Sequence, residues 1–557
     1  MQPATFDSWK ISELRGYLLQ KRFAVPKLQR NFVWDAKRAA MLLDSMYRGI
    51  PIGSLFLWEM NQSSGHLIRQ SEADILPLFS LDHTKIWFVI DGQQRLSVIY
   101  QAFEGAKKEN DAGREIDFGR LCFVVYPDKE KDSPRIVYRK PVGRDIVPLR
   151  DILAADWQKR MPNHSANFLA RIKKCRDQIL TYPLPIVLVS KANLKEIGEV
   201  FVRVNSQGMR ITSADRAIAR IGKLDVRAMA QELRQQVRQN VFALGTIDPI
   251  LMGFNLISER PELDSLAPKL DVMAQRWSKR IEEDSGALAQ FTKQWNNYRY
   301  AFLSAVDYLH HKFPVYNESF LPSANMLATL AVFFYYHPGQ PNPFQAGEIR
   351  KWFWATGVGK RYSGSGYHRN IVADSVFFES LALNKRKYFA FTDFLDPVVD
   401  LQNETYNSGS SCSRAFFCLL AAQNPRYFEG GDFIPLDRAT ASHSNRKHRH
   451  HVFPQAQLRS HLRSRDYNSL CNICFLVSRD NQKIGNKLPR TYLADYRSEG
   501  RGVFAKVMKS HLIPVGETGG VWQTNIKTGF KQFRADRLSL IRKAFEKQAG
   551  IRLFRSV

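Results

Sequence analysis

Long apolar runs and abundant cysteine are both missing from this 557-residue sequence. Its first residues mix acidic and basic side chains, and no stretch approaches about 18 consecutive apolar residues, so the sequence predicts neither a signal peptide nor a membrane span. The six cysteines are sparse and irregularly spaced, which argues against a secreted disulfide scaffold and favours the cytoplasm. Cys471 and Cys474 form a lone C-x-x-C pair, which we interpret as packing residues because a structural zinc site would lack half of its ligands.

Negative charge is also scarce. Asp and Glu number 53 against 81 Lys and Arg, which gives a formal net charge of +28. A polyanionic partner, nucleic acid above all, is the first expectation from this imbalance. The alternative is a basic protein without a nucleic-acid role. The chain is too long for one hydrophobic core, so it is expected to form several folding units.

Two adjacent histidines, His450 and His451, are the clearest chemical signal in the C-terminal part. One imidazole can bind a divalent cation while the other accepts a proton from water, which is what metal-assisted phosphodiester hydrolysis requires. A short strand holding both histidines, a second strand beginning near Asn472 and a helix carrying Asn481 can bring these four side chains around one ion.

This pattern resembles the HNH, or ββα-metal, nucleases over roughly residues 440 to 500. The resemblance implies that His450 is a metal ligand and that His451 is the general base. It implies further that Asn472 braces the loop of the base and that Asn481 is the second metal ligand.

One departure from the family pattern leaves the identity of the metal ion open. Related restriction proteins usually have Asp or Glu where His450 stands. A carboxylate favours Mg²⁺, whereas an imidazole also suits Zn²⁺, Ni²⁺ or Mn²⁺, so Mg²⁺ or Mn²⁺ is the expected ion and Zn²⁺ or Ni²⁺ is the alternative. His443 and His448 lie close by, so the alternative interpretation is a histidine-rich basic loop on the surface.

A second polar motif follows the apolar run at residues 86–90. It consists of Asp91, Gly92, Gln93, Gln94 and Arg95. Helix-forming residues continue over 96–103, so the motif is predicted to lie at a strand-to-helix turn. Unpaired N–H groups at a helix N-terminus suit phosphate, and Arg95 can grip a phosphate with two hydrogen bonds. The sequence contains no Walker A pattern, so nucleotide would be bound here without a P-loop.

Together with the upstream pattern P-x-x-Q-R-x-x-x-W, the D-G-Q-Q-R motif resembles the DUF262 domain, the ParB/sulfiredoxin-like nucleotide-hydrolysing module of GmrSD-type and related type IV restriction proteins. The resemblance implies binding and hydrolysis of a nucleoside triphosphate at the motif. We interpret Gln29 and Arg30 of the upstream pattern as DNA- or substrate-binding residues. Asn205 and Gly208 match a further family pattern that Asp215 can complete, with a helix C-cap as the alternative.

The segment 360–369 interleaves cations with aromatic residues. Arg361 and Arg369 can hold a phosphate backbone while Tyr362 stacks on a base, so these three residues are candidate DNA contacts. The alternative is an ordinary solvated surface loop.

Several local signals predict secondary structure and core. Asp35 is placed to cap a helix, and residues 86–90 read as a buried strand. Trp352, Phe353 and Trp354 are predicted to be core residues of a helix. Leu538, Ile541 and Phe545 mark an amphipathic helix that packs back on the core.

We therefore predict an α+β protein in three parts: a ParB/sulfiredoxin-like DUF262 domain over 1–220, a helical middle over 221–430 and a ββα-metal HNH nuclease domain over 431–557. The expected function is a nucleotide-regulated, metal-dependent endonuclease that restricts modified foreign DNA. Its expected partners are double-stranded phage DNA and a nucleoside triphosphate, with no membrane; a homo-oligomer is left open. The alternative is a nucleotide-regulated DNA-binding or defence-signalling protein whose HNH domain does not cut.

Overall fold

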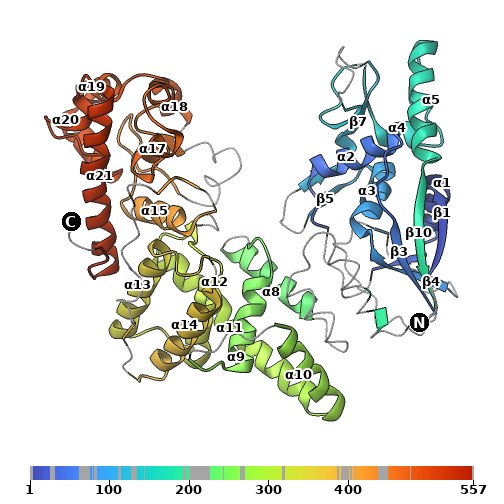
Figure 1. Cartoon of the computed structure of the whole chain (residues 1–557), viewed down its shortest axis with the longest axis horizontal. Coiled ribbons are helices and arrows are strands. Elements are labelled where there is room, and N and C mark those ends of the chain that lie inside the picture. Colours follow the sequence, from blue (N-terminus) through green and yellow to red (C-terminus); the bar gives the residue numbers. More distant parts are fainter. Residues whose placement is uncertain are drawn as a thin grey trace. The chain divides into compact units, whose positions relative to one another are not determined.

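The structure is a computed structural model, and the chain forms two compact units (Figure 1). Unit 1 comprises Met1–Met229 and Lys269–Ser285, and unit 2 comprises Ala230–Pro268 and Gly286–Val557. The residues that the structure describes are 4–25, 32–61, 76–77, 80, 85–110, 115–126, 134–143, 145–190, 192, 196–197, 200, 226–241, 244–263, 270–316, 320–364, 366–385, 388–389, 401, 404–407, 409–436, 449–476 and 478–554.

Unit 1 is built on a five-stranded mixed sheet with the order β1-β10-β3-β4-β2. The strands are β1 Thr5–Lys10, β2 Phe23–Ala24, β3 Leu55–Asn61, β4 Lys85–Asp91 and β10 Pro183–Val189. β10 runs parallel to β3 and antiparallel to β1, while β4 runs antiparallel to β3 and parallel to β2. Trp87 and Val89 of β4 join the larger hydrophobic core, and Ile86, Phe88 and Ile90 join a smaller cluster. Because side chains alternate along a strand, both faces of β4 are covered.

Helices and short hairpins complete unit 1. The helices are α1 Ile11–Leu19, α2 Ala36–Tyr47, α3 Gln93–Glu104, α4 Leu149–Leu153, α5 Ala166–Leu180 and α10 Leu270–Glu283, and unit 1 also holds the start of α8 Val226–Asn240. The additional strands are β5 Lys107–Glu109, β6 Glu115–Asp117, β7 Leu121–Val124, β8 Ile136–Tyr138 and β9 Ile146–Pro148. The larger core of unit 1 includes Leu43 of α2, Leu96 of α3 and Ile172 of α5, all fully buried.

Unit 2 begins with a helical region. Its helices are α9 Asp248–Glu259, α11 Ala287–Lys312, α12 Asn325–Tyr336, α13 Pro343–Val358, α14 Tyr367–Ala382 and α15 Ser411–Ala422. α12 is buried along most of its length because it packs against α9, α11 and α14. An apolar helix without a polar face is stable in water only when it is surrounded in this way.

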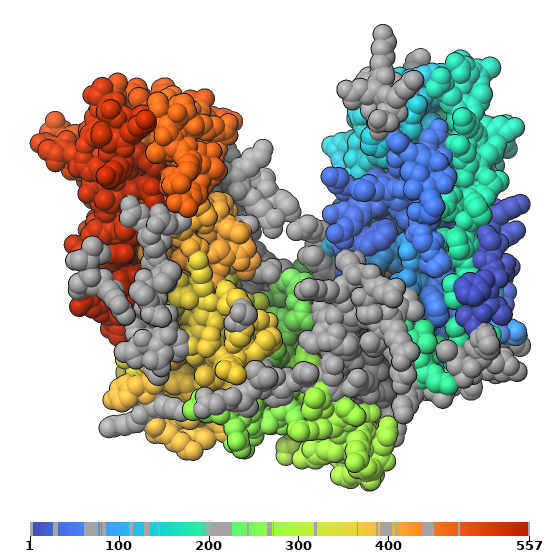
Figure 2. Space-filling view, viewed as in Figure 1, coloured from blue at the N-terminus to red at the C-terminus, as the bar shows by residue number. Residues whose placement is uncertain are grey.

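The C-terminal part of unit 2 contains β11 Arg449–His451, β12 Ile473–Phe475, α16 Gln455–Leu458, α17 Ser464–Tyr467, α18 Ser478–Ile484, α19 Pro489–Glu499, α20 Arg501–Ser510 and α21 Ile526–Ala549. It packs directly on the helical region: α21 contacts α13, and the rings of Trp354 and Phe545 are 5.8 Å apart. Figure 2 shows the red C-terminal part continuous with the yellow helical part. Apart from residues 221–229 and 269–285, which belong to unit 1, the segments predicted as 221–430 and 431–557 share one compact unit.

The local sequence signals are confirmed. Asp35 caps α2 by accepting a hydrogen bond from the Arg38 N–H at 2.8 Å. The strand predicted over 86–90 is β4, and the aromatic residues 352–354 are buried in α13. Leu538, Ile541 and Phe545 are buried on α21. None of the described helices combines the length and apolar character that a bilayer span needs.

Candidate active site

β11, β12 and α18 carry the predicted residues and form a strand–strand–helix unit, in which Val452, Cys474 and Ile484 share one hydrophobic core. β11 runs antiparallel to β12, with His450 opposite Cys474 and His451 opposite Ile473. Asn481 lies half-buried in α18, and its carbonyl accepts the N–H of Gly485. The structure thus has a strand at His450 and His451, a second strand directly after Asn472 and a helix at Asn481. The His450 side chain is outside the described part of the structure, as are His443 and His448, so shared binding of one ion by His450 and Asn481 stays a prediction.

His451 is half-buried, and its Nε2 atom lies 2.9 Å from Oδ1 of Asn468. Burial lowers the pKa of His451, because desolvation disfavours the charged imidazolium, and the hydrogen bond to Asn468 opposes this effect. The imidazole is therefore neutral at neutral pH. A neutral imidazole with one free lone pair is the form that a general base requires.

Asn472 is fully buried and bonds to the chain just before α16 and to the last residue of α17. Its Oδ1 accepts the Phe453 N–H at 2.8 Å, and its Nδ2 donates to the carbonyls of Phe453 at 3.1 Å and Tyr467 at 2.9 Å. Its own carbonyl accepts the Val452 N–H at 2.8 Å. Asn472 therefore holds the backbone that directly follows His451.

Arg537 supports the same unit from α21 and was not anticipated from the sequence. Its guanidinium is fully buried and donates to the carbonyls of Cys471 and Ile473, both at 2.8 Å. It also donates to the carbonyls of His511 at 3.0 Å and Leu512 at 3.1 Å. The available signal was its position, since residues 533, 537, 541 and 545 follow one another at helical spacing along the apolar face of α21.

Two further contacts near His451 were also missed. The Tyr492 hydroxyl of α19 donates to the Val452 carbonyl at 2.8 Å. Gln455 Nε2 donates to Asn468 Oδ1 at 2.8 Å. Both residues lie near the predicted site residues in the sequence, but sequence spacing alone does not show which groups they bond to.

Exposed cations lie on the segment between β11 and β12. Arg459, Arg463 and Arg465 are all exposed, and the last two share Asp466 as an ion-pair partner. This segment therefore presents positive charge at the surface.

In unit 1, the D-G-Q-Q-R motif occupies the strand-to-helix turn that was predicted for it. Asp91 ends β4, Gly92 has a φ of +92°, and α3 begins at Gln93. A Cβ atom at Gly92 would lie 2.5 Å from the Leu55 side chain and 3.2 Å from the Arg95 guanidinium, so glycine is required here for space as well as for backbone conformation.

Arg95 was expected to bind a phosphate with two hydrogen bonds, but in the structure its guanidinium bonds to other protein groups. Its Nη1 donates to the Ile52 carbonyl at 3.2 Å, and its Nη2 donates to the Ser54 carbonyl at 2.8 Å and to Asp91 Oδ2 at 2.9 Å. Gln94 Oε1 likewise accepts the Val33 N–H at 2.8 Å. These side chains anchor neighbouring loops to the turn, because their hydrogen-bonding groups point into the protein.

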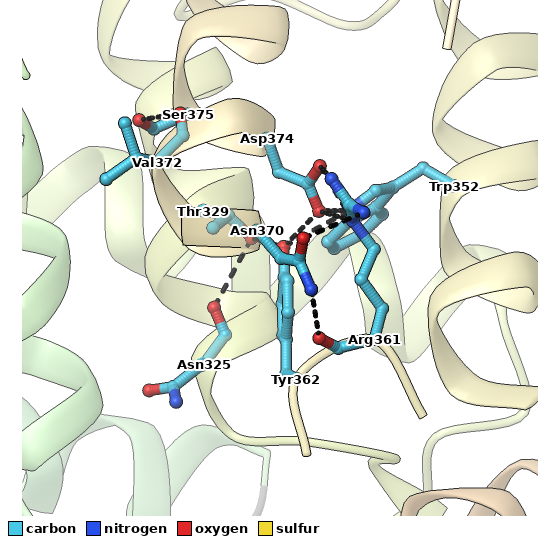
Figure 3. Close-up of polar contacts among 9 residues, drawn as sticks. All are labelled: Asn325, Thr329, Trp352, Arg361, Tyr362, Asn370, Val372, Asp374 and Ser375. Atoms are coloured by element: carbon cyan, nitrogen blue, oxygen red, sulfur yellow. Dashed lines mark hydrogen bonds and ion pairs between the residues drawn. The ribbon is translucent and has the colours of Figure 1, made fainter. Parts of the chain in front are cut away.

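Two of the three candidate DNA contacts in segment 360–369 are buried, so the prediction that they contact DNA is wrong. Arg361 and Tyr362 lie in the interior of unit 2, where both bond to the buried carboxylate of Asp374 (Figure 3). Arg361 Nη2 donates to Oδ1 at 2.7 Å, and the Tyr362 hydroxyl and the Trp352 indole donate to Oδ2 at 2.5 and 3.0 Å. Only Arg369 of the three is exposed. A DNA strand cannot reach side chains enclosed in this way.

The remaining predicted residues fall outside the described part of the chain. They are Gln29, Arg30, Asn205, Gly208 and Asp215. Among the described residues, no group of three or more His, Cys, Asp or Glu side chains is arranged to hold a metal ion. Cys471 and Cys474 are buried, as expected for packing residues, and burial raises the pKa of Cys474 to about 12.

Comparison with known proteins gives a match for the N-terminal region. Residues 12–221 match the family described as the N-terminal domain of the GmrSD restriction endonuclease. This match supports a GmrSD-like restriction family for that region. An uncharacterized protein of Methanocaldococcus jannaschii, MJ0686, is 21% identical over 546 residues, which covers 88% of this chain and 87% of the relative. That similarity extends beyond residue 221 into unit 2.

Proposed function

We propose that this chain is a nucleotide-regulated, metal-dependent DNA endonuclease of the restriction kind, acting in defence against modified foreign DNA. The observation that carries the proposal is the position of His451. It is a half-buried imidazole at the end of β11, on a strand–strand–helix unit whose following loop is held by the buried amide of Asn472. The proposed role in defence rests on the match of residues 12–221 to the N-terminal domain of a restriction endonuclease.

In the proposed reaction, His451 accepts a proton from the water that attacks the phosphodiester. Lowering of its pKa by burial keeps the imidazole neutral and able to do so at neutral pH. Asn472 keeps the loop after His451 from shifting, so the base stays in place. The exposed Arg459 attracts the DNA backbone towards this edge.

His450 and Asn481 are proposed to hold the divalent ion. An imidazole nitrogen and an amide oxygen from adjacent elements fit Mg²⁺, Mn²⁺, Zn²⁺ or Ni²⁺ and leave further positions for water and phosphate oxygens. When bound, the ion supplies Lewis-acid stabilisation of the charge that develops at the phosphate and at the leaving oxygen.

Unit 1 is proposed to bind and hydrolyse a nucleoside triphosphate and to control cleavage. The proposed phosphate site is the turn from β4 to α3, because it lies at a helix N-terminus, and Asp91 stands at its edge. Arg95 and Gln94 act in this proposal as the residues that shape the turn, since they bond to neighbouring loops. A nucleotide that alters the turn can therefore alter the position of those loops.

The test is a cleavage assay on matched DNA substrates. Purified full-length protein is incubated with plain, hydroxymethylated, glucosylated and phosphorothioated DNA, with EDTA, Mg²⁺ or Mn²⁺, and with or without nucleoside triphosphate. The proposal predicts metal-dependent cleavage of a modified substrate, lost in His451→Ala and kept in His461→Ala, which removes an exposed histidine from the same segment. Binding of DNA without metal-dependent cleavage by the wild type would instead identify a non-cutting DNA-binding protein.

A further inference from the structure

The Asn468 side chain contacts the His451 imidazole. A chain of hydrogen bonds determines whether the oxygen or the nitrogen of the Asn468 amide faces His451. The order is Arg459, Gln455, Asn468 and His451. Arg459 Nη2 donates to Gln455 Oε1 at 3.3 Å, and Gln455 Nε2 donates to Asn468 Oδ1 at 2.8 Å. The same Oδ1 atom lies 2.9 Å from His451 Nε2. These four side chains are called the His451 relay below.

The direction of the relay follows from the chemistry of its first member. A guanidinium donates hydrogen bonds and accepts none, so Arg459 requires Gln455 to present its oxygen. Gln455 must then present its NH₂ group to Asn468. Asn468 in turn must present its oxygen, because two NH₂ groups facing each other would leave both without an acceptor.

Asn468 is also bonded on its other side, which holds the residue in place. Its Nδ2 donates to Ser464 Oγ at 3.1 Å, and its backbone is held by the Tyr406 N–H, which donates to the Asn468 carbonyl at 2.8 Å. Rotation of the amide by half a turn would keep a bond to Ser464, whose hydroxyl can donate as well as accept, but would set the Asn468 NH₂ group against the NH₂ group of Gln455 and break that bond. The oxygen of Asn468 therefore stays towards the imidazole.

We infer that Asn468 is the positioning residue that holds the proton of neutral His451 on Nε2 and leaves the Nδ1 lone pair for the attacking water. An oxygen acceptor at 2.9 Å requires Nε2 to be the donor. The same contact fixes the plane of the ring. It also remains satisfied after His451 has accepted a proton, because the imidazolium still donates from Nε2. This inference rests on the proposed function for its catalytic meaning, but the tautomer itself is a property of the protein alone.

The first experiment measures the tautomer directly. Full-length protein labelled with ¹⁵N-histidine is examined by NMR at a pH where the imidazole is neutral, and the His451 resonances are assigned by their loss in His451→Ala. The expected wild-type spectrum has a protonated Nε2 and an unprotonated Nδ1. Asn468→Leu, which offers no acceptor, is expected to give a mixture of the two tautomers, whereas Asn468→Asp keeps the Nε2–H form.

Two arginine variants test the relay while leaving Asn468 in place. Arg459→Ala removes the donor that orients Gln455, so a measurable fraction of the Nδ1–H tautomer is expected. Arg463→Ala removes an exposed arginine of the same segment that pairs with Asp466, and the His451 resonances are expected to stay as in the wild type. A wild-type spectrum with the proton on Nδ1, or an unchanged spectrum in Asn468→Leu, would overturn the inference.

Cleavage kinetics separate this inference from the proposed function. Asn468→Leu is expected to lower kcat by about tenfold or more with little change in KM, and Asn468→Asp to recover most of the loss. If the wild type shows the Nε2–H tautomer but does not cut DNA, the proposed function fails and the assignment of Asn468 stands. If the wild type cuts DNA with His451 in the other tautomer, the assignment of Asn468 fails and the function stands.

Discussion

Asn472 shows how much one buried amide contributes near His451. All of its hydrogen-bonding ends meet backbone groups of Phe453 and Tyr467, so the side chain is satisfied and immobile. Loss of such a group leaves its partners buried without hydrogen bonds, which costs more than the bonds themselves contribute to stability.

Asn472→Ala is accordingly expected to lower the free energy of unfolding by about 2–4 kcal/mol, because each stranded buried partner costs about 1–3 kcal/mol. Denaturant unfolding of the full chain measures the change. The matched control is Asn486→Ala, which truncates an exposed asparagine in the same region and should change stability by less than about 0.5 kcal/mol. Equal effects of the two substitutions would contradict the bracing role of Asn472.

His511 gives the chain a pH-dependent stability. It is fully buried, its Nε2 lies 2.8 Å from the Arg426 carbonyl, and burial lowers its pKa to about 4. The unfolded chain binds a proton near pH 6.5 while the folded chain does not, so stability is fully present above pH 6.5 and is lost as pH falls towards 4. The shift corresponds to roughly 3 kcal/mol.

The measurement is denaturant unfolding of wild type and His511→Gln at several pH values between 4 and 7. His511→Gln is expected to be less stable at pH 7 but to lose less stability on acidification than the wild type does. Parallel curves for the two proteins across this range would show that His511 does not titrate as its burial requires.

At the scale of elements, close backbone contacts decide which glycines can be replaced. Gly529 of α21 lies against the backbone at Gly520, where a Cβ atom would come within 2.7 Å of the Gly520 carbonyl oxygen. Gly347 of α13 is also helical, but a Cβ atom there meets no described atom within 4 Å. The two positions form a matched pair within unit 2.

Gly529→Ala is expected to lower the unfolding free energy by about 1–3 kcal/mol, since the backbone of α21 must shift away from Gly520. Gly347→Ala is expected to raise it by about 0.5–1 kcal/mol, because alanine loses less conformational entropy in a helix. Thermal or urea unfolding reports both signs. Destabilisation by Gly347→Ala, or stabilisation by Gly529→Ala, would contradict the packing of α13 or α21.

Local elements could be predicted from the sequence because their signals are local. Asp35 caps the helix that immediately follows it, and the apolar run 86–90 needs no distant partner to read as a strand. The burial of Arg361 and Tyr362 could not be predicted in this way. The carboxylate that captures them, Asp374, lies on the next helix, and without it the segment has the composition of an exposed binding loop.

The same distinction applies to the candidate site. The pattern of histidines and amides predicted two strands and a helix in this region, and β11, β12 and α18 lie there, while the metal site and the general base stay predictions. Asn468 and Arg537 were not found, because they reach His451 and Cys471 across 17 and 66 residues. Such contacts depend on the folded backbone, which no spacing rule within one segment describes.

At the scale of the whole molecule, the net charge of +28 is expected to dominate DNA affinity. Binding that neutralises about six phosphates should weaken on the order of 10³-fold between about 50 and 200 mM salt, because condensed counterions are released from the DNA. Fluorescence anisotropy with labelled duplex DNA and no divalent ion measures this dependence. An affinity that is insensitive to salt would contradict an electrostatic interface.

Metal-dependent cleavage centred on His451 is tested most directly by a Mn²⁺ titration of the DNA cleavage rate for the wild type, His451→Ala and Asn481→Ala. His451→Ala is expected to lower the maximal rate by about 100-fold or more with little change in the Mn²⁺ concentration at half-maximal rate, because a base is lost and the ligands remain. Asn481→Ala is expected to raise that Mn²⁺ concentration by about tenfold or more. Wild-type cleavage that needs no divalent ion, or unchanged titrations in both variants, would contradict the assignment.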